Sequence, residues 1–255
     1  MLKVIFANII LALFYPENSW LNELTSMDHM VEYNKINLSQ VGADPEVVKD
    51  NATWPLTPTT RTDSGVELPL ATFDTVPTHV SNVEELETSY DKCQSVVAQH
   101  ASALRTKAML SAAYNIAPAS NAAATPVLPT TGNNRGDGNK ALTYADILNL
   151  RTKFNKANYP QQGRVIVLCP EHEEDLLNED VNRYNQIMTT GQVAGFKVYV
   201  TNHGVQYSTS GTKQAYGTTN AQPCSFAFCK EEVMRAMARR NCPAVKAIPP
   251  TTGWS

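Results

Sequence analysis

The chain has 255 residues, of which 42% are hydrophobic, so it is long enough to bury a sizeable core in one elaborate domain or two small ones. Its formal net charge is −3, and its Lys and Arg residues are scattered except at Arg235, Arg239 and Arg240, which argues against direct recognition of DNA. The five cysteines are odd in number and contain no C-x-x-C pair, which favours reduced thiols and folding in the cytosol.

An apolar run over residues 4–15 follows Lys3 near the N-terminus. A secretory signal is one interpretation, but the run is short, has no A-x-A cleavage pattern and is followed at once by Pro16. It is also too short to span a bilayer as a helix. We therefore favour an amphipathic arm whose apolar side docks on a neighbouring surface. After this arm the pattern predicts a short helix over residues 19–33 and irregular chain over residues 35–50.

Residues 52–80 are rich in Thr and Pro and contain two β-type runs, 53–62 and 66–76. The runs flank Asp63-Ser64-Gly65, which is a turn signal, so the pattern predicts a long two-stranded hairpin. An isolated two-stranded ribbon is only marginally stable in water. We therefore expect the hairpin to lie on another surface, such as another copy of the chain.

The longest helical pattern covers residues 81–115, where apolar or small residues recur at steps of three and four. Ser81 and Glu84 form a capping box at its start, and Pro118 ends it. At a rise of 1.5 Å per residue, roughly 33 residues make a rod about 50 Å long. No second helix of similar length is predicted to pair with it, so we interpret it as the spine of an extended subunit rather than half of a coiled coil.

Residues 117–140 are dominated by Ala, Pro, Thr, Asn and Gly, which is typical of a loop or linker. The tripeptide Arg135-Gly136-Asp137 matches an integrin-binding sequence. Three common residues in a Gly- and Asn-rich loop occur together by chance, however, and we do not assign adhesion to them.

Regular structure resumes at Thr143, which is a predicted N-cap for a helix to about Asn158. Residues 165–168 form a continuous apolar run, which is typical of a strand buried on both faces. A second helix then begins with acidic residues in its first turn, where the helix dipole favours negative charge. Its inward-facing residues are predicted to be Leu176, Leu177 and Tyr184.

Residues 191–200 predict a turn followed by a strand, since apolar and polar side chains alternate from Phe196 onward. Residues 202–222 form a polar stretch of about 20 residues, long enough that a functional or interfacial loop is favoured. Residues 225–228 predict a further strand, and residues 230–240 either a helix or a strand before a Pro-rich tail.

The order of these elements resembles that of the Hong Kong 97-type major capsid protein of tailed bacteriophages, above all over residues 141–177 and 191–202. In that family a helix, a Pro, a Gly-Arg leading into a buried strand, a Pro with an acidic helix and a Gly-x-x-Gly-Phe-x-Val strand build much of the axial domain. No single motif is specific, and the resemblance rests on order and spacing over essentially the whole chain. The matching residues are Pro160, Gly163, Arg164, Pro170, Leu176, Gly191, Val193, Ala194 and residues 195–198.

The resemblance implies an α+β fold of the Hong Kong 97 type with an N-terminal arm, an extended β-hairpin loop, a long spine helix in a peripheral domain and an α/β axial domain. Family members usually return to the peripheral domain through further strands, whereas little chain follows Pro243 here, so we expect a small peripheral sheet. The implied segments are 1–50 for the arm, 51–80 for the hairpin, 81–142 for the peripheral domain and linker, 143–243 for the axial domain and 244–255 for the tail.

The implied function is that of a structural subunit, not an enzyme. The resemblance implies that copies of the chain form hexamers and pentamers of an icosahedral phage head that encloses double-stranded DNA. The implied location is the virion, after assembly in the host cytoplasm, with no membrane involved. The implied partners are other copies of the chain, a scaffolding protein, the portal, cement or minor capsid proteins, and packaged DNA bound non-specifically.

Candidate inter-subunit contacts lie in the hairpin, because large apolar side chains tend to dominate the energetics of interfaces. For the apolar candidates, packing within the hairpin is an equal alternative. For the charged candidate near the tip, a solvated surface charge is the alternative to pairing with an acidic neighbour. The candidates are Trp54, Leu56, Arg61, Leu70 and Phe73.

Two other functions remain as alternatives. One is an encapsulin-like compartment shell, and the other is a small thiol hydrolase that uses Cys169 with His172 or His203. No Gly-rich nucleophile elbow accompanies Cys169, so a structural cysteine is favoured. The acidic residues 171–175 point in different directions on a helix and favour a solvated turn over a metal site. With no P-loop, dinucleotide fingerprint or HExxH motif in the sequence, we assign no catalytic, cofactor-binding or metal-ligating residues.

Overall fold

The computed structural model describes residues 19–40, 42, 46–47, 49–51, 54–55, 58, 60–76, 78, 92–122, 125–136 and 139–237. These residues belong to two compact units. Unit 1 takes the described parts of residues 1–25 and 72–234, and unit 2 takes those of residues 26–71 and 235–255. The predicted amphipathic arm, the capping box of Ser81 and Glu84, and the C-terminal tail lie outside the described residues.

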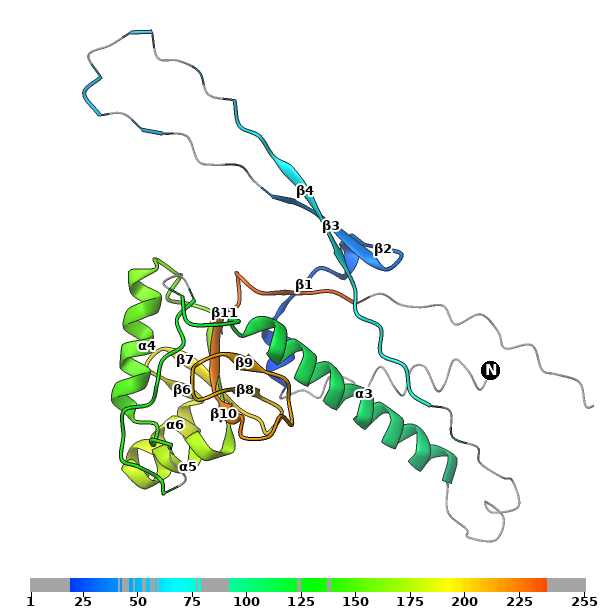
Figure 1. Ribbon diagram of the computed structural model, residues 1–255, viewed down its shortest axis with the longest axis vertical. Coiled ribbons are helices and arrows are strands. Elements are labelled where there is room, and N and C mark those ends of the chain that lie inside the picture. Colours follow the sequence, from blue (N-terminus) through cyan, green and yellow to red (C-terminus); the bar gives the residue numbers. More distant parts are fainter. Residues whose placement is uncertain are drawn as a thin grey trace, which may run out of the picture. The chain divides into compact units, whose positions relative to one another are not determined.

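A four-stranded sheet forms the centre of unit 1 (Figure 1), with the strand order β11-β5-β7-β6. β5 (Arg164–Leu168) pairs in parallel with β7 (Phe196–Val200) and antiparallel with β11 (Phe226–Cys229). β6 (Gln192–Val193) is a short antiparallel edge strand beside β7. All five residues of β5 are buried, which confirms the predicted strand with two covered faces.

Alternate residues of β5 contribute to two separate cores, because successive side chains point to opposite faces of a sheet. Ile166 and Leu168 pack against α4 (Tyr144–Lys156), α5 (Pro170–Glu179) and α6 (Val181–Thr190), which lie together beside one face of the sheet in Figure 1. Val165 and Val167 pack in the other core against buried residues of the segment before β1, the end of α3, β8 and β11. That second core contains Trp20, Leu21, Leu24, Ala113, Ala117, Val205, Tyr207, Phe226 and Phe228.

The predicted helix after Thr143 is confirmed as α4. Thr143 caps it through a reciprocal box, in which the Thr143 hydroxyl accepts from the Asp146 N–H and the Asp146 carboxylate accepts from the Thr143 N–H. Phe154 faces inward and packs edge-on against Phe196 at 5.3 Å between ring centroids. The carboxyl end of α4 is followed by residues that lead into β5.

The second helix of this region is two helices, contrary to the prediction of one. Asp180 has an extended backbone, and its carboxylate accepts from the N–H groups of Asn182 and Arg183. A side chain that satisfies the free N–H groups of a new first turn starts a helix at that point. Leu176 is buried and Tyr184 is half-buried as predicted, whereas Leu177 is 37% exposed. Gly191 then ends α6 in the left-handed conformation that the predicted turn required.

The described part of the long helix is α3 (Lys92–Ile116), which ends two residues before Pro118 as predicted. Its buried Ala113 has no exposed surface and packs in the second core. Two contacts from the following sheet hold this end. The Tyr207 hydroxyl donates to the Pro118 carbonyl at 2.6 Å, and Lys213 Nζ donates to the Tyr114 and Ala117 carbonyls.

The prediction of one polar loop over residues 202–222 was wrong. This segment contains β8 (Val205–Tyr207) and β9 (Lys213–Gln214), which join β10 (Gln222–Cys224) in a three-stranded sheet of order β10-β8-β9. Val205 and Tyr207 are buried on either side of Gln206. A strand with two buried residues is too short to stand out within a Ser-, Thr- and Gly-rich sequence.

The prediction of a short helix over residues 19–33 was also wrong in kind. The segment contains two 3-10 turns, η1 (Trp20–Glu23) and η2 (Asp28–Met30), and two short strands, β1 (Thr25–Ser26) and β2 (Val31–Glu32). β1 pairs with β12 (Met234–Arg235), which is a strand in the segment where either a helix or a strand was expected. Trp20 and Leu21 are buried in the second core, so packing favours the tight turn.

Unit 2 contains a hairpin ribbon whose first strand differs from the prediction. β3 (Lys35–Gln40) pairs antiparallel with β4 (Ser64–Pro69), in a sheet of order β2-β3-β4. Residues 35–50 were expected to be irregular, and residues 53–62 were expected to form the first strand. Asp63 does not form the predicted turn, since its carboxylate accepts from Arg61 and from the Gly42 N–H, while Ser64 and Gly65 belong to β4.

Candidate interaction surface

The β3–β4 ribbon has one apolar face and one polar face. The register places Ile36 opposite Leu68 and Leu38 opposite Val66, and residues opposite each other in an antiparallel pair share a face. The other face carries Asn37 and Ser39 on β3 with their partners on β4. It also carries an ion pair between Lys35 Nζ and the Glu67 carboxylate at 2.9 Å. A strand pair with this alternation is suited to pack one face on another surface.

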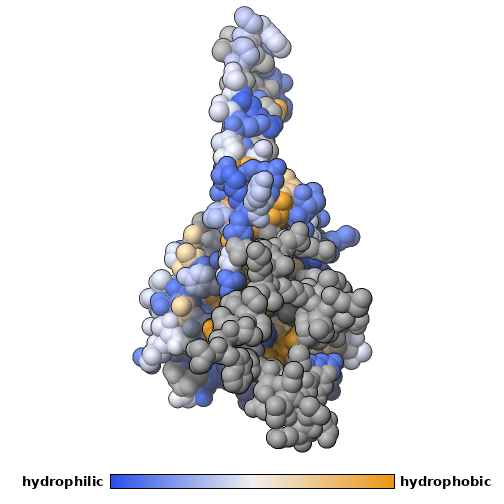
Figure 2. Space-filling model, turned by 90° about the vertical axis from the view of Figure 1, so that its right-hand side faces the viewer, coloured by the Kyte–Doolittle hydropathy of each residue, from blue (hydrophilic) through white to orange (hydrophobic). Residues whose placement is uncertain are grey.

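The apolar face remains partly in contact with solvent. Ile36 is 7% exposed, but Val66 and Leu68 are 36% and 46% exposed. On the side of the molecule shown in Figure 2, hydrophilic colours cover most of the ribbon, with small hydrophobic areas between them. Contact between aliphatic side chains and water is unfavourable, and burial of these side chains against another surface would remove it. This face is therefore the candidate interaction surface of unit 2.

The predicted contact residues occupy different environments. Trp54 is 75% exposed and Phe73 is 42% exposed, so both offer large apolar surfaces. Leu70 is half-buried, and its N–H donates to the Asn34 carbonyl at 2.9 Å. Arg61 forms a two-point ion pair with Asp63 of the same chain, at 2.7 and 3.0 Å, and both side chains remain exposed to solvent. Leu56 lies outside the described residues.

The residues that sequence reasoning missed are Ile36 and Leu38. The signal that could have identified them is the alternation Lys-Ile-Asn-Leu-Ser-Gln over residues 35–40, which matches a half-buried strand. Only two apolar residues carry it, and the Thr-rich stretch that follows has the stronger strand propensity. The pairing of β3 with β4 therefore depends on contacts between residues that are 24 to 34 positions apart in the chain.

The cysteine of the hydrolase alternative lies in a buried polar cluster at the carboxyl end of β5. The Ser225 hydroxyl lies 2.7 Å from His172 Nδ1 and 3.7 Å from Cys169 Sγ, and accepts from the Cys169 N–H at 3.0 Å. Burial raises the pKa of the Cys169 thiol to about 12, and burial also lowers the pKa of His172. The thiolate is the nucleophilic form of cysteine, and a pKa raised this far disfavours the thiolate at neutral pH.

The arginine of the Arg135-Gly136-Asp137 tripeptide is engaged within unit 1. Arg135 donates to the Asp175 carboxylate at 3.1 Å and to the Glu171 carbonyl at 3.0 Å. Asp175 is 7% exposed and also accepts from the Leu142 N–H. The Arg135 side chain therefore ties the linker to α5, which is a structural role that the sequence did not reveal.

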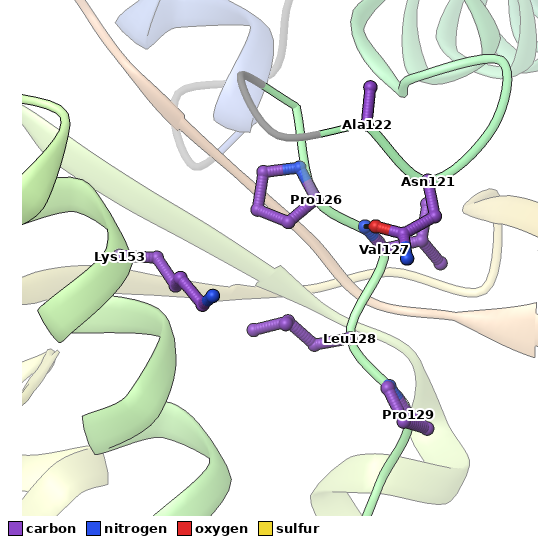
Figure 3. A pocket seen from close by; sticks show the side chains of 7 residues that line it. All are labelled: Asn121, Ala122, Pro126, Val127, Leu128, Pro129 and Lys153. Atoms are coloured by element: carbon purple, nitrogen blue, oxygen red, sulfur yellow. Dashed lines mark hydrogen bonds between the residues drawn. The ribbon is translucent and has the colours of Figure 1, made fainter.

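A pocket of about 360 Å³ lies between the linker and α4 (Figure 3). Lys153 points from α4 toward Leu128 across this pocket, and the linker supplies most of the lining. Within the described ranges, no group of three or more His, Cys, Asp or Glu side chains has a geometry that could hold a metal ion. The helices among the same residues are all too short or too polar to cross a membrane.

Comparison with known proteins gives structural neighbours only. No protein-family model matches the chain, and no curated protein does. A chain of Mycobacterium phage Che8 matches with a TM-score of 0.55 and 17% identity, over 76% of this chain and 72% of that one.

Two capsid structures match to a similar extent. The capsid of Cyanophage P-SCSP1u gives a TM-score of 0.55 with 15% identity, over 84% of this chain and 72% of that one. The mature capsid of bacteriophage PhiM1 gives 0.53 with 13% identity, over 85% of this chain and 73% of that one. The chain thus has an α+β fold like that of phage capsid chains, and the predicted fold class is confirmed at that level.

Proposed function

We propose that this chain is a major capsid protein of the Hong Kong 97 type, which assembles into hexamers and pentamers of an icosahedral phage head around double-stranded DNA. The observation that carries the proposal is the likeness of fold to phage capsid chains over more than four fifths of this chain in two cases. The order of elements in the sequence supports it independently. The protein acts mechanically and is located in the virion, after assembly in the host cytoplasm.

The ribbon of unit 2 supports a role in assembly. A thin sheet with one apolar face gains burial only from a surface outside itself, because three short strands cannot enclose a core of their own. In the proposed shell this face lies on a second copy of the chain. Each such contact is small, but many copies in a closed shell add avidity. Trp54, Leu56 and Leu70 extend the proposed contact of unit 2, Phe73 is a separate proposed contact in unit 1, and Arg61 binds Asp63 where the loop joins β4.

The remaining proposed partners follow from the family resemblance. They are a scaffolding protein, the portal, and cement or minor capsid proteins. Packaged DNA is contacted non-specifically, in keeping with the net charge of −3. An encapsulin-like shell would use the same assembly contacts with protein cargo in place of DNA, whereas the buried thiol of Cys169 gives no support to a hydrolase.

Assembly and its contents test the proposal directly. The full chain is co-expressed with the neighbouring phage genes that supply any scaffold, and the products are examined by sedimentation and negative-stain microscopy. Closed shells that protect DNA from nuclease are expected. A chain that stays monomeric at high concentration with the scaffold present would contradict the proposal, and shells that enclose only protein cargo would favour the encapsulin-like alternative.

The role of the ribbon has a test with a matched control. Val66→Asp combined with Leu68→Asp adds two charges to the apolar face, and Asn37→Asp combined with Ser39→Asp adds two charges to the polar face. We expect the first variant to remain as soluble subunits and the second to form shells, since only the apolar face is proposed to be buried. Removal of residues 57–70 should likewise prevent closed shells. Normal shells from the Val66 and Leu68 variant would refute the role of this face.

A further inference from the structure

The exposed side of α4 carries an uncompensated positive charge. Arg151, Lys153 and Lys156 are all exposed, and none of them makes an ion pair or side-chain hydrogen bond with another described residue. The sequence contains no Asp or Glu between Asp146 and Glu171. We call Arg151, Lys153 and Lys156 the basic surface.

The exposed side of α5 carries the opposite charge. Residues 171–180 contain six acidic residues and no Lys or Arg. Glu174, Asn178 and Glu179 are exposed, as is the apolar Leu177, which lies one helical turn from Glu174. Part of this charge is offset, because Arg135 binds the buried Asp175 and lies 3.7 Å from the Glu174 carboxylate, and Arg183 of α6 lies 4.5 Å from the centre of the Tyr144 ring. We call Glu174, Leu177, Asn178 and Glu179 the acidic surface.

The two surfaces cannot neutralise each other within one chain. The Glu179 carboxylate accepts from the Tyr144 N–H at 2.8 Å, which places the acidic surface at the amino end of α4. Lys153 and Lys156 follow Tyr144 by nine and twelve residues, or about 14 and 18 Å along the helix axis at 1.5 Å per residue. Charges separated by more than about 8 Å are largely screened in water at physiological salt. One unit thus displays opposite charges at opposite ends.

Surfaces of opposite charge at the two ends of α4 fit a head-to-tail contact between copies of the chain, and such a contact closes into a ring when the rotation between copies allows it. The pocket beside Lys153 adds an apolar element, because its lining residues Pro126, Val127 and Leu128 can receive an aliphatic side chain next to the cations. Leu177 is an exposed aliphatic side chain among acidic residues, so it could enter such a pocket while its acidic neighbours meet the cations. The negative net charge of the chain favours a protein partner over a nucleic acid for the basic surface.

We propose that the basic surface of α4 binds the acidic surface of α5 on a second copy of the chain. This inference rests on the proposed function, since it assigns two of the surfaces through which copies would meet in a ring. Electrostatic complementarity of this kind sets the orientation of the partners and the rate of association. The contact selects head-to-tail neighbours and disfavours pairing of two like-charged surfaces.

A charge exchange tests the pairing. The basic-surface variant is Lys153→Glu with Lys156→Glu, and the acidic-surface variant is Glu174→Lys with Asn178→Lys. Each should require about tenfold more protein for assembly than the native chain, because each places like charges at every contact. A chain that carries both pairs of substitutions should assemble again, since every head-to-tail contact between its copies is once more complementary. Assembly of the native chain should also weaken as NaCl is added.

A control variant separates the effect of these two surfaces from a general effect of charge. Lys107→Glu reverses the charge at an exposed site on α3, outside both surfaces, and should assemble normally. Variants that assemble like this control would overturn the inference and leave the proposed function standing. So would a chain with all four substitutions that stays unassembled although circular dichroism shows it folded, or a basic-surface variant that forms normal shells and loses only their DNA. A native chain that never assembles would overturn the proposed function and this inference together.

Discussion

Lys213 is expected to hold the carboxyl end of α3 in place. Its Nζ donates to the Tyr114 carbonyl at 2.7 Å and to the Ala117 carbonyl at 2.8 Å, and lies 4.2 Å from the centre of the Tyr114 ring. The last carbonyls of a helix lack partners within the helix and carry partial negative charge. Lys213 of β9 therefore donates hydrogen bonds to carbonyls at the end of α3 and also places a positive charge beside their partial negative charge.

The cost of removing this contact can be estimated for Lys213→Met, which keeps most of the aliphatic stem. Hydrogen bonds to a charged group contribute about 1.5–3 kcal/mol each, and a cation at a helix end about 0.3–1 kcal/mol. The two bonds share one half-buried ammonium, and their contributions are not additive. We expect a loss of about 2 kcal/mol, or about 4–8 °C in the Tm of a unit of this size.

Urea unfolding of dissociated subunits measures this loss, and hydrogen exchange of the amides in the last turn of α3 locates it. Lys140→Met is the control, because it removes an exposed lysine amino group that makes none of these contacts. It should change the free energy of unfolding by less than about 0.5 kcal/mol. A Lys213→Met subunit as stable as this control, or equal exchange at the end of α3, would refute the assigned role.

Three further outcomes are expected. Hydrogen bonds from Lys197 and Tyr199 lower the pKa of Glu23 below its usual value near 4.5, so its contribution is present above that pH and is lost as the pH falls through the lower, folded-state pKa. Glu23→Gln should therefore flatten acid denaturation followed by fluorescence, and an unchanged profile would contradict this. Cys169 should resist iodoacetamide at neutral pH until the chain unfolds, as mass spectrometry would show; rapid labelling of the folded chain would revive the hydrolase alternative. Phe196→Ala should cost about 3–5 kcal/mol by calorimetry, because its fully buried ring leaves a cavity.

Local signals predicted the α/β part of unit 1 well. Thr143 and Asp146 are three residues apart and close a capping box by themselves, so the start of α4 depends on almost nothing distant. The apolar run of β5 is buried on both faces, as a run without polar residues must be. Gly191 ends α6 because a left-handed residue costs glycine little.

Distant partners decided the elements that were predicted wrongly. Ile36 belongs to a strand because it pairs with Leu68, and nothing in the sequence around Ile36 predicts that partner. Val205 and Tyr207 of β8 are buried in the second core, and this packing favours the strand. Asp180 was the exception, since an Asp before two free N–H groups is a local signal for a new helix that the prediction did not use.

The candidate site follows the same division. The sequence alone predicted that a Thr-rich segment with few bulky apolar residues needs an outside surface and that Cys169 is structural, because composition and spacing are local properties. The tertiary structure decided which face of the ribbon is apolar, that Arg61 binds Asp63, and that basic and acidic residues lie at opposite ends of α4. These depend on register and helix packing, which bring together residues whose separation along the chain carries no information about their partners.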